Sequence, residues 1–308
     1  MDICLWDKCN NRCWMCTNPD LPWKNSQGEI GEGYDYDLLI DRIKRLKDKI
    51  QPDEPIILTG GEPTLHPRFL DIFWFIRKTF PDHELRLLTN GRRFYYRDFT
   101  EEVMSADNLN IAVSLCGPNA KVHDGVTRTK NSFVHFTKGL ENILDLKKGH
   151  SIEIRTVLTK LTAKYIDQTL NLIYSRFPSI DRVIVIYLEA EGQAKNNLDK
   201  VMIPYSKVRP HLNKIQPFFS VLKELRLYHF PLCTLDYKLW PFVWRTLPKE
   251  EVTFISSCQK CLYKKYCLGI HRDYPDKIKS KEFKPMQEKY IIKETGDFYH
   301  PIVGIEKE

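Results

Sequence analysis

The chain has 308 residues and a formal net charge of +7, and 42% of its residues are hydrophobic. This length and composition allow one large domain, or a large and a small domain, around a substantial core. The sequence contains no apolar run of about 18 residues and no signal-peptide pattern, which argues against a membrane-spanning or exported protein. The modest positive charge favours nucleic acid as a partner only weakly.

Short apolar segments alternate with longer amphipathic segments over the part of the chain that ends near residue 192. Strands are predicted at residues 3–6, 55–62, 84–91, 110–117, 151–159 and 182–192. Helices are predicted at residues 35–50, 67–79, 98–106, 134–148 and 162–176. Because most of these strands are continuous apolar runs, they are expected to form a parallel sheet covered by helices. Six strand–helix repeats are too few for a closed eight-stranded barrel, so the predicted α/β fold is a six-stranded partial (β/α)6 barrel.

The pattern changes after about residue 200, where a polar helix or helix pair at roughly 204–225 precedes a stretch rich in Trp, Pro and Cys. This change predicts a chain of three parts. They are a core at residues 1–203, a small cysteine-rich domain at 204–275, and a C-terminal tail at 276–308 that lies partly ordered along the core.

Loops of unusual composition follow the first four predicted strands. They are CNNRCWMC at 9–16, TGGEP at 59–63, TNG at 89–91 and SLCG at 114–117. Because the carboxyl ends of parallel strands meet at one edge of the sheet, these loops are expected to form a single site. Their glycines allow close backbone approach and positive φ, although Gly91 and Gly117 are also typical of ordinary turns.

The nine cysteines form two tight clusters plus single residues, which is not the pattern of a disulfide framework. In a chain without an export signal, clustered cysteines indicate metal or redox sites and a reducing cytoplasm. Cys9, Cys13 and Cys16 offer three thiolates on one short loop. Such a set can hold three irons of a four-iron cluster and leave the fourth iron open. Zinc with a remote fourth ligand, or a disulfide with a spare thiol, are the alternatives.

A second set consists of Cys258, Cys261 and Cys267, with Cys233 at a distance. Four cysteines make a closed site, in which every ligand position is filled by the protein. Four thiolates suit a zinc ion as well as an iron–sulfur cluster. A closed site indicates electron transfer or a structural function rather than direct binding of a substrate.

The first cysteine motif, with Met15 just before its last cysteine, resembles that of the radical S-adenosylmethionine (radical SAM) superfamily, as does TGGEP on the second strand. The resemblance covers residues 2 to about 192. It implies a [4Fe–4S] cluster whose open iron binds SAM, reductive cleavage of SAM to a 5′-deoxyadenosyl radical, and abstraction of a substrate hydrogen. It also implies a reducing partner such as flavodoxin or ferredoxin.

The resemblance assigns individual positions to SAM. It places the methionine amine at the TGGEP backbone near Glu62, the ribose at Ser114, and the SAM carboxylate at Arg155. An internal ion pair is the alternative for Arg155, because an unpaired buried charge is costly. Adenine contact is implied for Leu188, whose alternative is plain core. The full set is Met15, Gly60, Gly61, Glu62, Pro63, Asn90, Ser114, Arg155 and Leu188.

Two cysteines remain outside the clusters. Cys4 lies in the first strand and is expected to be core. On the fourth strand, the period of two puts Cys116 on the same face as Ser114, toward the cofactor. A thiol there could donate a hydrogen atom to a substrate radical as a catalytic group. Its alternative is a small buried hydrophobe.

The spacing of the second cysteine set resembles the SPASM and shorter twitch extensions of radical SAM enzymes, which bind auxiliary clusters. Four cysteines fit the one-cluster form, so two [4Fe–4S] clusters are expected in all. Residues 230–270 also look like peptide maturases of the His-Xaa-Ser system type, which implies a ribosomally made precursor peptide as substrate. The alternatives are a small-molecule or nucleotide substrate and, outside enzymes, an iron–sulfur electron carrier.

Overall fold

The computed structural model describes residues 1–18, 32–47, 49–275 and 282–307. Eight strands form one sheet in which neighbours along the chain are also neighbours in the sheet. Every neighbouring pair is parallel. The strands are β1 (Asp2–Trp6), β2 (Ile56–Gly60), β3 (Leu85–Thr89), β4 (Leu109–Ser114), β5 (Ser151–Leu158), β6 (Arg182–Tyr187), β7 (Leu225–Tyr228) and β8 (Val243–Trp244).

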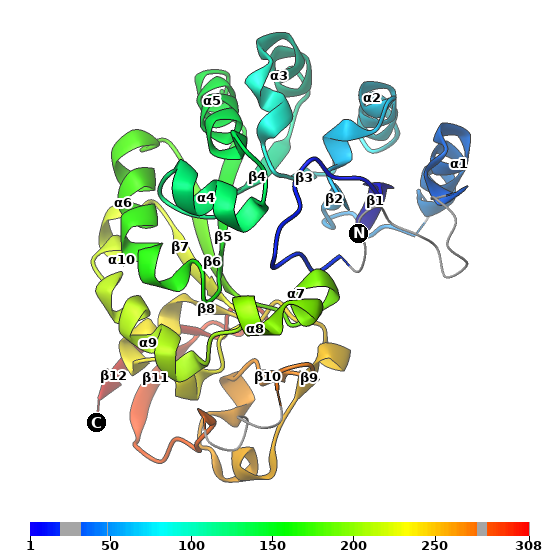
Figure 1. The fold of residues 1–308 in the computed structure, drawn as a ribbon. Coiled ribbons are helices and arrows are strands. Elements are labelled where there is room, and N and C mark those ends of the chain that lie inside the picture. The colour runs from blue at the N-terminus through cyan, green and yellow to red at the C-terminus, as the bar shows by residue number, and fades with distance from the viewer. Residues whose placement is uncertain (19–31, 48, 276–281, 308) are drawn as a thin grey trace.

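The helices of the described residues are α1 (Tyr36–Leu46), α2 (Phe69–Thr79), α3 (Arg97–Met104), α4 (Ala120–Thr127), α5 (Ser132–Asp145), α6 (Ile166–Arg176), α7 (Gly192–Asn196), α8 (Leu198–Val201), α9 (Tyr205–Lys214) and α10 (Phe218–Val221). In Figure 1 the strands form an arc, and α1, α2, α3, α5 and α6 line its outside. None of these helices is both long enough and apolar enough to cross a membrane. Of the helix predicted at 35–50, position 48 lies outside the described residues.

Alternation along each strand separates two environments. In β3, Leu85 and Leu87 are buried in a core that also contains Phe73 of α2. Arg86 and Leu88 point the other way and line a cavity inside the arc. The outer face therefore holds the sheet and helices together, while the inner face can carry polar groups.

The parallel α/β fold is confirmed, but the sheet has eight strands rather than six. The additional strands β7 and β8 are only four and two residues long. In β7, buried Leu225 and Leu227 alternate with half-buried Arg226 and Tyr228, so the segment lacks the continuous apolar run expected of a buried parallel strand. The sheet thus continues past the boundary expected near residue 203.

The polar segment at 204–225 contains two short helices, α9 and α10, which is one of the two forms predicted for it. Pro210 lies inside α9, which ends at Lys214, and Pro217 is the N-cap of α10. A proline is tolerated at the start of a helix, because the first backbone N–H groups have no partner within the helix.

The carboxyl-terminal part folds into two small antiparallel pairs. One pair is β9 (Val252–Thr253) with β10 (Ile270–His271), and the other is the hairpin of β11 (Tyr290–Glu294) and β12 (Ile302–Lys307). The hairpin packs on the preceding region through ring stacking between Tyr237 and Tyr290, with centroids 4.6 Å apart. The predicted tail at 276–308 thus contains a regular hairpin, and its residues 276–281 and 308 lie outside the described part.

Candidate active site

The segment after β1, which carries Cys9, Cys13 and Cys16, is held tightly against the turn after β2. The N–H of Gly61 donates to the carbonyl of Trp6 at 2.8 Å, and the N–H of Glu62 donates to the carbonyl of Lys8 at 2.8 Å. A Cβ on Gly60 would lie 2.2 Å from the Trp6 oxygen, and one on Gly61 would lie 2.5 Å from the Lys8 oxygen. Both glycines are therefore required for this close backbone approach.

The opposite side of the cysteine loop is anchored to α4. The N–H of Arg12 donates to the carbonyl of Thr127 at 2.9 Å, and the N–H of Trp14 donates to the carbonyl of Val126 at 3.1 Å. Figure 1 shows the loop inside the arc, between the ends of β1 and β2 and helix α4. The loop is thus held at both edges by backbone hydrogen bonds.

The three thiols are half-buried and interact with one another. Burial raises the pKa of Cys9 to about 12, with a further rise from the charge of Glu62. Burial also raises the pKa of Cys13, followed by the effects of Cys116, Cys16 and Cys9. Left alone, such thiols would stay protonated, whereas a bound cationic iron–sulfur core stabilises them as thiolates. The donor set therefore fits the iron–sulfur cluster predicted from the sequence.

Glu62 fastens the turn after β2 to the turn after β3. Its buried carboxylate accepts hydrogen bonds from the Thr64 N–H at 3.2 Å and the Thr64 hydroxyl at 2.6 Å. It also accepts from the Thr89 hydroxyl at 2.7 Å and the Asn90 N–H at 2.7 Å. Burial raises the pKa of Glu62, and these donors oppose that rise. Glu62 thus has a structural function, while its contact with the SAM amine stays a prediction. Pro63 begins the short helix η2 that follows.

Asn90 and Arg92 hold the cysteine loop from the β3 side. The side-chain amide of Asn90 donates to Asn10 Oδ1 at 2.7 Å and lies 3.8 Å from Cys9 Sγ. Arg92 Nη1 donates to the carbonyl of Asn10 at 2.6 Å and to Asn11 Oδ1 at 3.0 Å. The sequence analysis singled out only Asn90 here. The sole signal for Arg92 was its position directly after the TNG turn.

Ser114 and Arg155, both assigned to SAM, are direct neighbours in the register of β4 and β5. Ser114 is exposed at the end of its strand. Arg155 Nε donates to Glu153 Oε1 at 2.5 Å, so the ion-pair alternative for this arginine is realised. The sequence could have indicated Glu153 as the partner of Arg155, because residues two apart in a strand point to the same face of the sheet.

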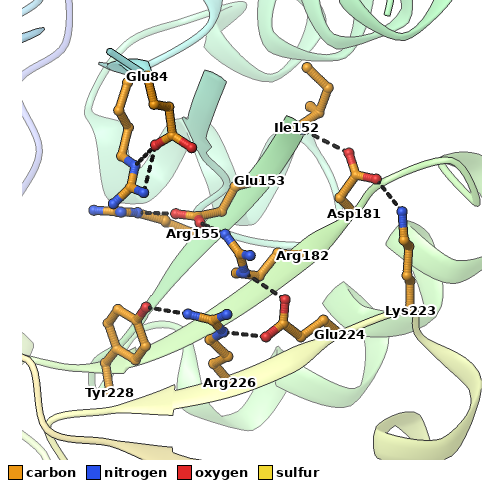
Figure 2. A network of polar contacts seen from close by, with 11 residues as sticks. Glu84, Ile152, Glu153, Arg155, Asp181, Arg182, Lys223, Glu224, Arg226 and Tyr228 are labelled. Carbon is orange, nitrogen blue, oxygen red and sulfur yellow. Dashed lines mark hydrogen bonds and ion pairs between the residues drawn. The ribbon is translucent and has the colours of Figure 1, made fainter. Parts of the chain in front are cut away.

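The Arg155–Glu153 pair belongs to a chain of charges along the inner face of the sheet, shown in Figure 2. The carboxylate of Glu153 is only 1% exposed and also lies 3.2 Å from Arg182 Nη1. The chain continues through Glu224, which lies 2.7 Å from Arg182 Nε and 2.5 Å from Arg226 Nε. Each carboxylate thus bridges two arginines, which keeps these half-buried cations paired.

A cavity of about 850 Å³ occupies the inside of the arc. Met15, Arg155 and Leu188, three of the positions assigned to SAM, line it together. Met15 and Leu188 also pack in one small hydrophobic cluster. The described residues that line the cavity do not include the other assigned positions, namely Gly60, Gly61, Glu62, Pro63, Asn90 and Ser114.

Cys116 does not share the environment of Ser114. Strand β4 ends at Ser114, so the two-residue period does not extend to Cys116, which is 3% exposed whereas Ser114 is exposed. Its N–H donates to His123 Nδ1 at 3.2 Å, and burial raises the pKa of its thiol to about 12. Because Cys116 raises the pKa of Cys13, its thiol lies near the first cysteine set. A hydrogen-donor function for Cys116 stays a prediction.

The second set of cysteines converges on one cavity. Cys233, Cys258, Cys261 and Cys267 all line it. Burial raises the pKa of Cys233 to about 12, and the three other cysteines raise it further. Cys258 lies in the short helix η8 (Ser256–Lys260), and burial raises the pKa of Cys267 to about 11. As in the first set, these thiols need a bound cation to become thiolates.

The carboxyl-terminal segment completes this second cavity. Phe283 and Pro285 contribute to its wall. The N–H of Met286 donates to Cys261 Sγ at 3.5 Å, and the N–H of Tyr290 donates to the Tyr263 hydroxyl at 2.7 Å. The four-cysteine site is therefore built from segments that span more than fifty residues of the chain.

Glu189 and His229 form a pair at the cavity that the sequence analysis did not identify. Glu189 follows β6 and His229 follows β7, so both stand at carboxyl ends of strands, and both line the cavity. His229 Nδ1 lies 3.2 Å from Glu189 Oε1. His229 has a φ of +67°, a strained conformation for a non-glycine residue. Burial raises the pKa of Glu189 to about 7 and lowers that of His229 to about 3.

The Glu189→Gln variant is expected to be more stable than the native protein above pH 7, by an amount on the order of 1–3 kcal/mol. The native carboxyl holds its proton up to about pH 7, against an ordinary value of 4.5. Its contribution to the free energy of unfolding therefore falls as pH rises through this window. Urea unfolding of both proteins between pH 5 and 8 measures the difference. His229, whose pKa is lowered, makes the free energy of unfolding rise with pH, but it does so equally in both proteins. If the free energy of unfolding changes with pH equally in both proteins, the raised pKa assigned to Glu189 is wrong.

Taken together, the parallel sheet, the three-thiol loop at its carboxyl edge and the internal cavity define an α/β enzyme of the iron–sulfur class. A family model described as the Radical SAM superfamily matches residues 3–173. The chain therefore belongs to the radical SAM superfamily, which implies SAM and a [4Fe–4S] cluster as cofactors.

Curated relatives include GTP 3′,8-cyclases. The chain is 32% identical to the enzyme of Haemophilus ducreyi over 174 residues, which is 54% of this chain and 47% of the relative. It is 28% identical to that of Campylobacter curvus over 234 residues, which is 74% of this chain and 66% of the relative. The Pyrococcus furiosus tungsten-containing aldehyde ferredoxin oxidoreductase cofactor-modifying protein is 37% identical over 90 residues, 28% of this chain and 22% of that protein. The chain thus spans less than two thirds of each of these relatives.

Solved structures with a similar fold include those of SuiB and anSMEcpe. Streptococcus suis SuiB bound to precursor peptide SuiA has a TM-score of 0.55 at 14% identity, over 73% of this chain and 47% of SuiB. The structure of anSMEcpe with bound AdoMet has a TM-score of 0.57 at 17% identity, over 73% of this chain and 61% of that chain. At these identities the similarity establishes the fold only.

Proposed function

We propose that this radical SAM enzyme carries two [4Fe–4S] clusters and modifies a ribosomally made precursor peptide. The cavity lined by Cys233, Cys258, Cys261 and Cys267 is the observation that carries the proposal. A closed four-thiol site beyond the core fits the auxiliary cluster of a twitch or SPASM-like extension within residues 204–275, in an enzyme of the His-Xaa-Ser maturase type. SuiB bound to precursor peptide SuiA and anSMEcpe with bound AdoMet and Cp18Cys peptide support a peptide substrate through their shared fold.

In this proposal the chain's own residues have distinct tasks. Cys9, Cys13 and Cys16 hold the SAM-binding cluster, and Met15 and Leu188 form an apolar wall beside it. With SAM, that cluster supplies a 5′-deoxyadenosyl radical that takes a hydrogen atom from the substrate. The internal cavity receives the substrate group to be modified and keeps water and other quenchers away. A flavodoxin or ferredoxin supplies the electrons.

A nucleotide substrate is the second candidate, because the curated relatives named above include GTP 3′,8-cyclases. The inner face of the sheet also carries several arginines, including Arg86, Arg155 and Arg182, which suit an anionic ligand. Their pairing with Glu84 and Glu153 reduces the charge available for this purpose.

The two candidates differ in what stimulates cleavage of SAM. The anaerobic holoenzyme is incubated with SAM, dithionite and either GTP or synthetic copies of the short peptides found encoded next to its gene, and 5′-deoxyadenosine is quantified. We expect one of these peptides to raise 5′-deoxyadenosine well above the substrate-free level and to change in mass. Stimulation by GTP alone would establish the nucleotide candidate instead. If no 5′-deoxyadenosine forms under any condition, the protein does not cleave SAM.

A further inference from the structure

A basic groove of about 660 Å³ lies next to the four-cysteine cavity. None of the described residues that line it carries a carboxylate. Its rings, Phe254 and Phe298, are 37% and 49% exposed. We define the basic groove by six of its residues: Arg245, Lys249, Phe254, Lys264, Lys265 and Phe298.

The positive charge of the basic groove is largely uncompensated. Lys265 lies 3.1 Å from Glu294 Oε1. Arg245 and Lys264 donate to neutral oxygens, the carbonyl of Lys265 at 3.0 Å and the side-chain amide of Gln259 at 2.8 Å. No ion pair to a carboxylate is formed by Arg245, Lys249 or Lys264 within the described part of the chain. Three cations are therefore available to a negatively charged partner.

These cations are positioned by aromatic rings. Arg245 Cζ lies 4.0 Å from the ring centroid of Phe298, and Lys249 Nζ lies 5.8 Å from it. Lys264 Nζ lies 5.3 Å from the centroid of Phe254. Cation–π contacts of this kind hold the charges over the ring faces. The covered faces are then poorly available for stacking on nucleic-acid bases, which argues against a single-stranded nucleic acid in the groove.

The basic groove and the four-cysteine cavity share a wall. Phe254, Lys264 and Cys267 line both. Arg245 Nη1 donates to the carbonyl of Lys265 at 3.0 Å, two residues before Cys267, so the groove and the cysteine site are linked through this short segment. A molecule seated in the basic groove would thus be separated from a cluster on these cysteines by this wall alone.

We propose that the basic groove is the docking surface of an acidic one-electron carrier protein of the ferredoxin or flavodoxin class. The carrier exchanges an electron with an auxiliary cluster on Cys233, Cys258, Cys261 and Cys267, and in this sense the inference rests on the proposed function. One electron leaves the reduced carrier and one enters the oxidised cluster, and no covalent bond or proton changes place. A small surface with strong charge complementarity suits the transient encounters of electron-transfer proteins.

Binding of an acidic [2Fe–2S] ferredoxin tests this assignment without knowledge of the substrate. The Lys249→Glu/Lys264→Glu double variant of the holoenzyme reverses two charges at the groove. We expect its Kd for the ferredoxin, measured by calorimetry at low ionic strength, to rise roughly 10- to 100-fold. The native Kd should also rise steeply with added salt.

The matched control is Lys138→Glu/Lys207→Glu, which makes the same change in net charge at exposed positions on α5 and α9. It should bind ferredoxin nearly as the native protein does. Equal affinity in all three proteins would overturn the docking assignment, as would a groove variant that loses affinity only for an acidic peptide or an oligonucleotide. Iron analysis separates the two proposals: about four irons per native chain would refute the auxiliary cluster itself.

Stopped-flow mixing adds a kinetic readout. Reduced ferredoxin is mixed with the oxidised holoenzyme, and the ferredoxin absorbance reports electron loss. We expect the groove variant to lower the second-order rate constant by a factor similar to its loss of affinity, with the control variant unchanged. A variant of Cys258 and Cys261 to alanine should still bind ferredoxin but not accept the electron at this site. Loss of binding in that variant would instead indicate that the cysteine site shapes the groove.

Discussion

Replacement of Cys9, Cys13 and Cys16 by alanine is expected to lower the iron content from about eight to about four atoms per chain and to abolish 5′-deoxyadenosine formation. These thiols lie on a loop fixed by hydrogen bonds to the turn after β2 and to α4, so their loss should remove the cluster and leave the fold in place. Iron analysis after anaerobic reconstitution, with product analysis by liquid chromatography, measures both effects.

The matched variant replaces Cys233, Cys258, Cys261 and Cys267 by alanine. It should also retain about four irons, but these would sit at the first site, so substrate-free cleavage of SAM should persist. If the first variant loses all of its iron, or if the native protein purified without oxygen contains zinc, the assignment of two four-iron clusters is wrong. Circular dichroism of both variants separates loss of a cluster from loss of the fold.

The second large effect concerns the buried carboxylate of Glu153. Its replacement by alanine is expected to lower the free energy of unfolding by about 3–5 kcal/mol, because Arg155 and Arg182 lose a shared partner. Glu141→Ala is the matched control, since Glu141 pairs with Arg176 on the surface and is 41% exposed. That change should cost at most about 1 kcal/mol. Similar losses in both variants would contradict a structural role for the charge chain.

Arg155→Ala distinguishes the two assignments of this arginine. Glu153 retains Arg182 in that variant, so the stability loss should be smaller than for Glu153→Ala. If Arg155 also binds the SAM carboxylate, SAM affinity should fall by roughly 1.5–3 kcal/mol, with iron content unchanged. Normal SAM affinity in the variant would leave Arg155 with the ion pair alone.

The core of the fold could be predicted because its strands are continuous apolar runs and its helices are amphipathic. Strand β7 could not, because it is short and alternates polar with apolar residues, and β8 could not, because it is only two residues long. No helix is predicted from the sequence where α4 lies, and this helix anchors the cysteine loop through Val126 and Thr127. Such anchoring depends on tertiary contacts that no local pattern encodes.

The candidate site also contains some features that could be predicted from the sequence and others that could not. The two cysteine sets could be identified because metal ligands follow short, regular spacings. The pair of Glu189 and His229 could not, because its residues follow different strands and meet only through the register of β6 and β7. The pairing of Arg155 depends on burial of Glu153, and the orientation of Cys116 depends on where β4 ends. Neither burial nor a strand end can be read reliably from alternation alone.

The wall of the four-cysteine cavity includes Phe283 and Pro285, and the N–H of Met286 reaches Cys261 Sγ at 3.5 Å. These residues come far later in the chain than Cys9, Cys13 and Cys16. Because proteins fold from the amino terminus during synthesis, the loop with Cys9, Cys13 and Cys16 can reach its final anchors while translation continues. The second cavity can close only after Phe283, Pro285 and Met286 have also been synthesised. The order of synthesis therefore lets the loop of the first site fold before the walls of the second cavity exist.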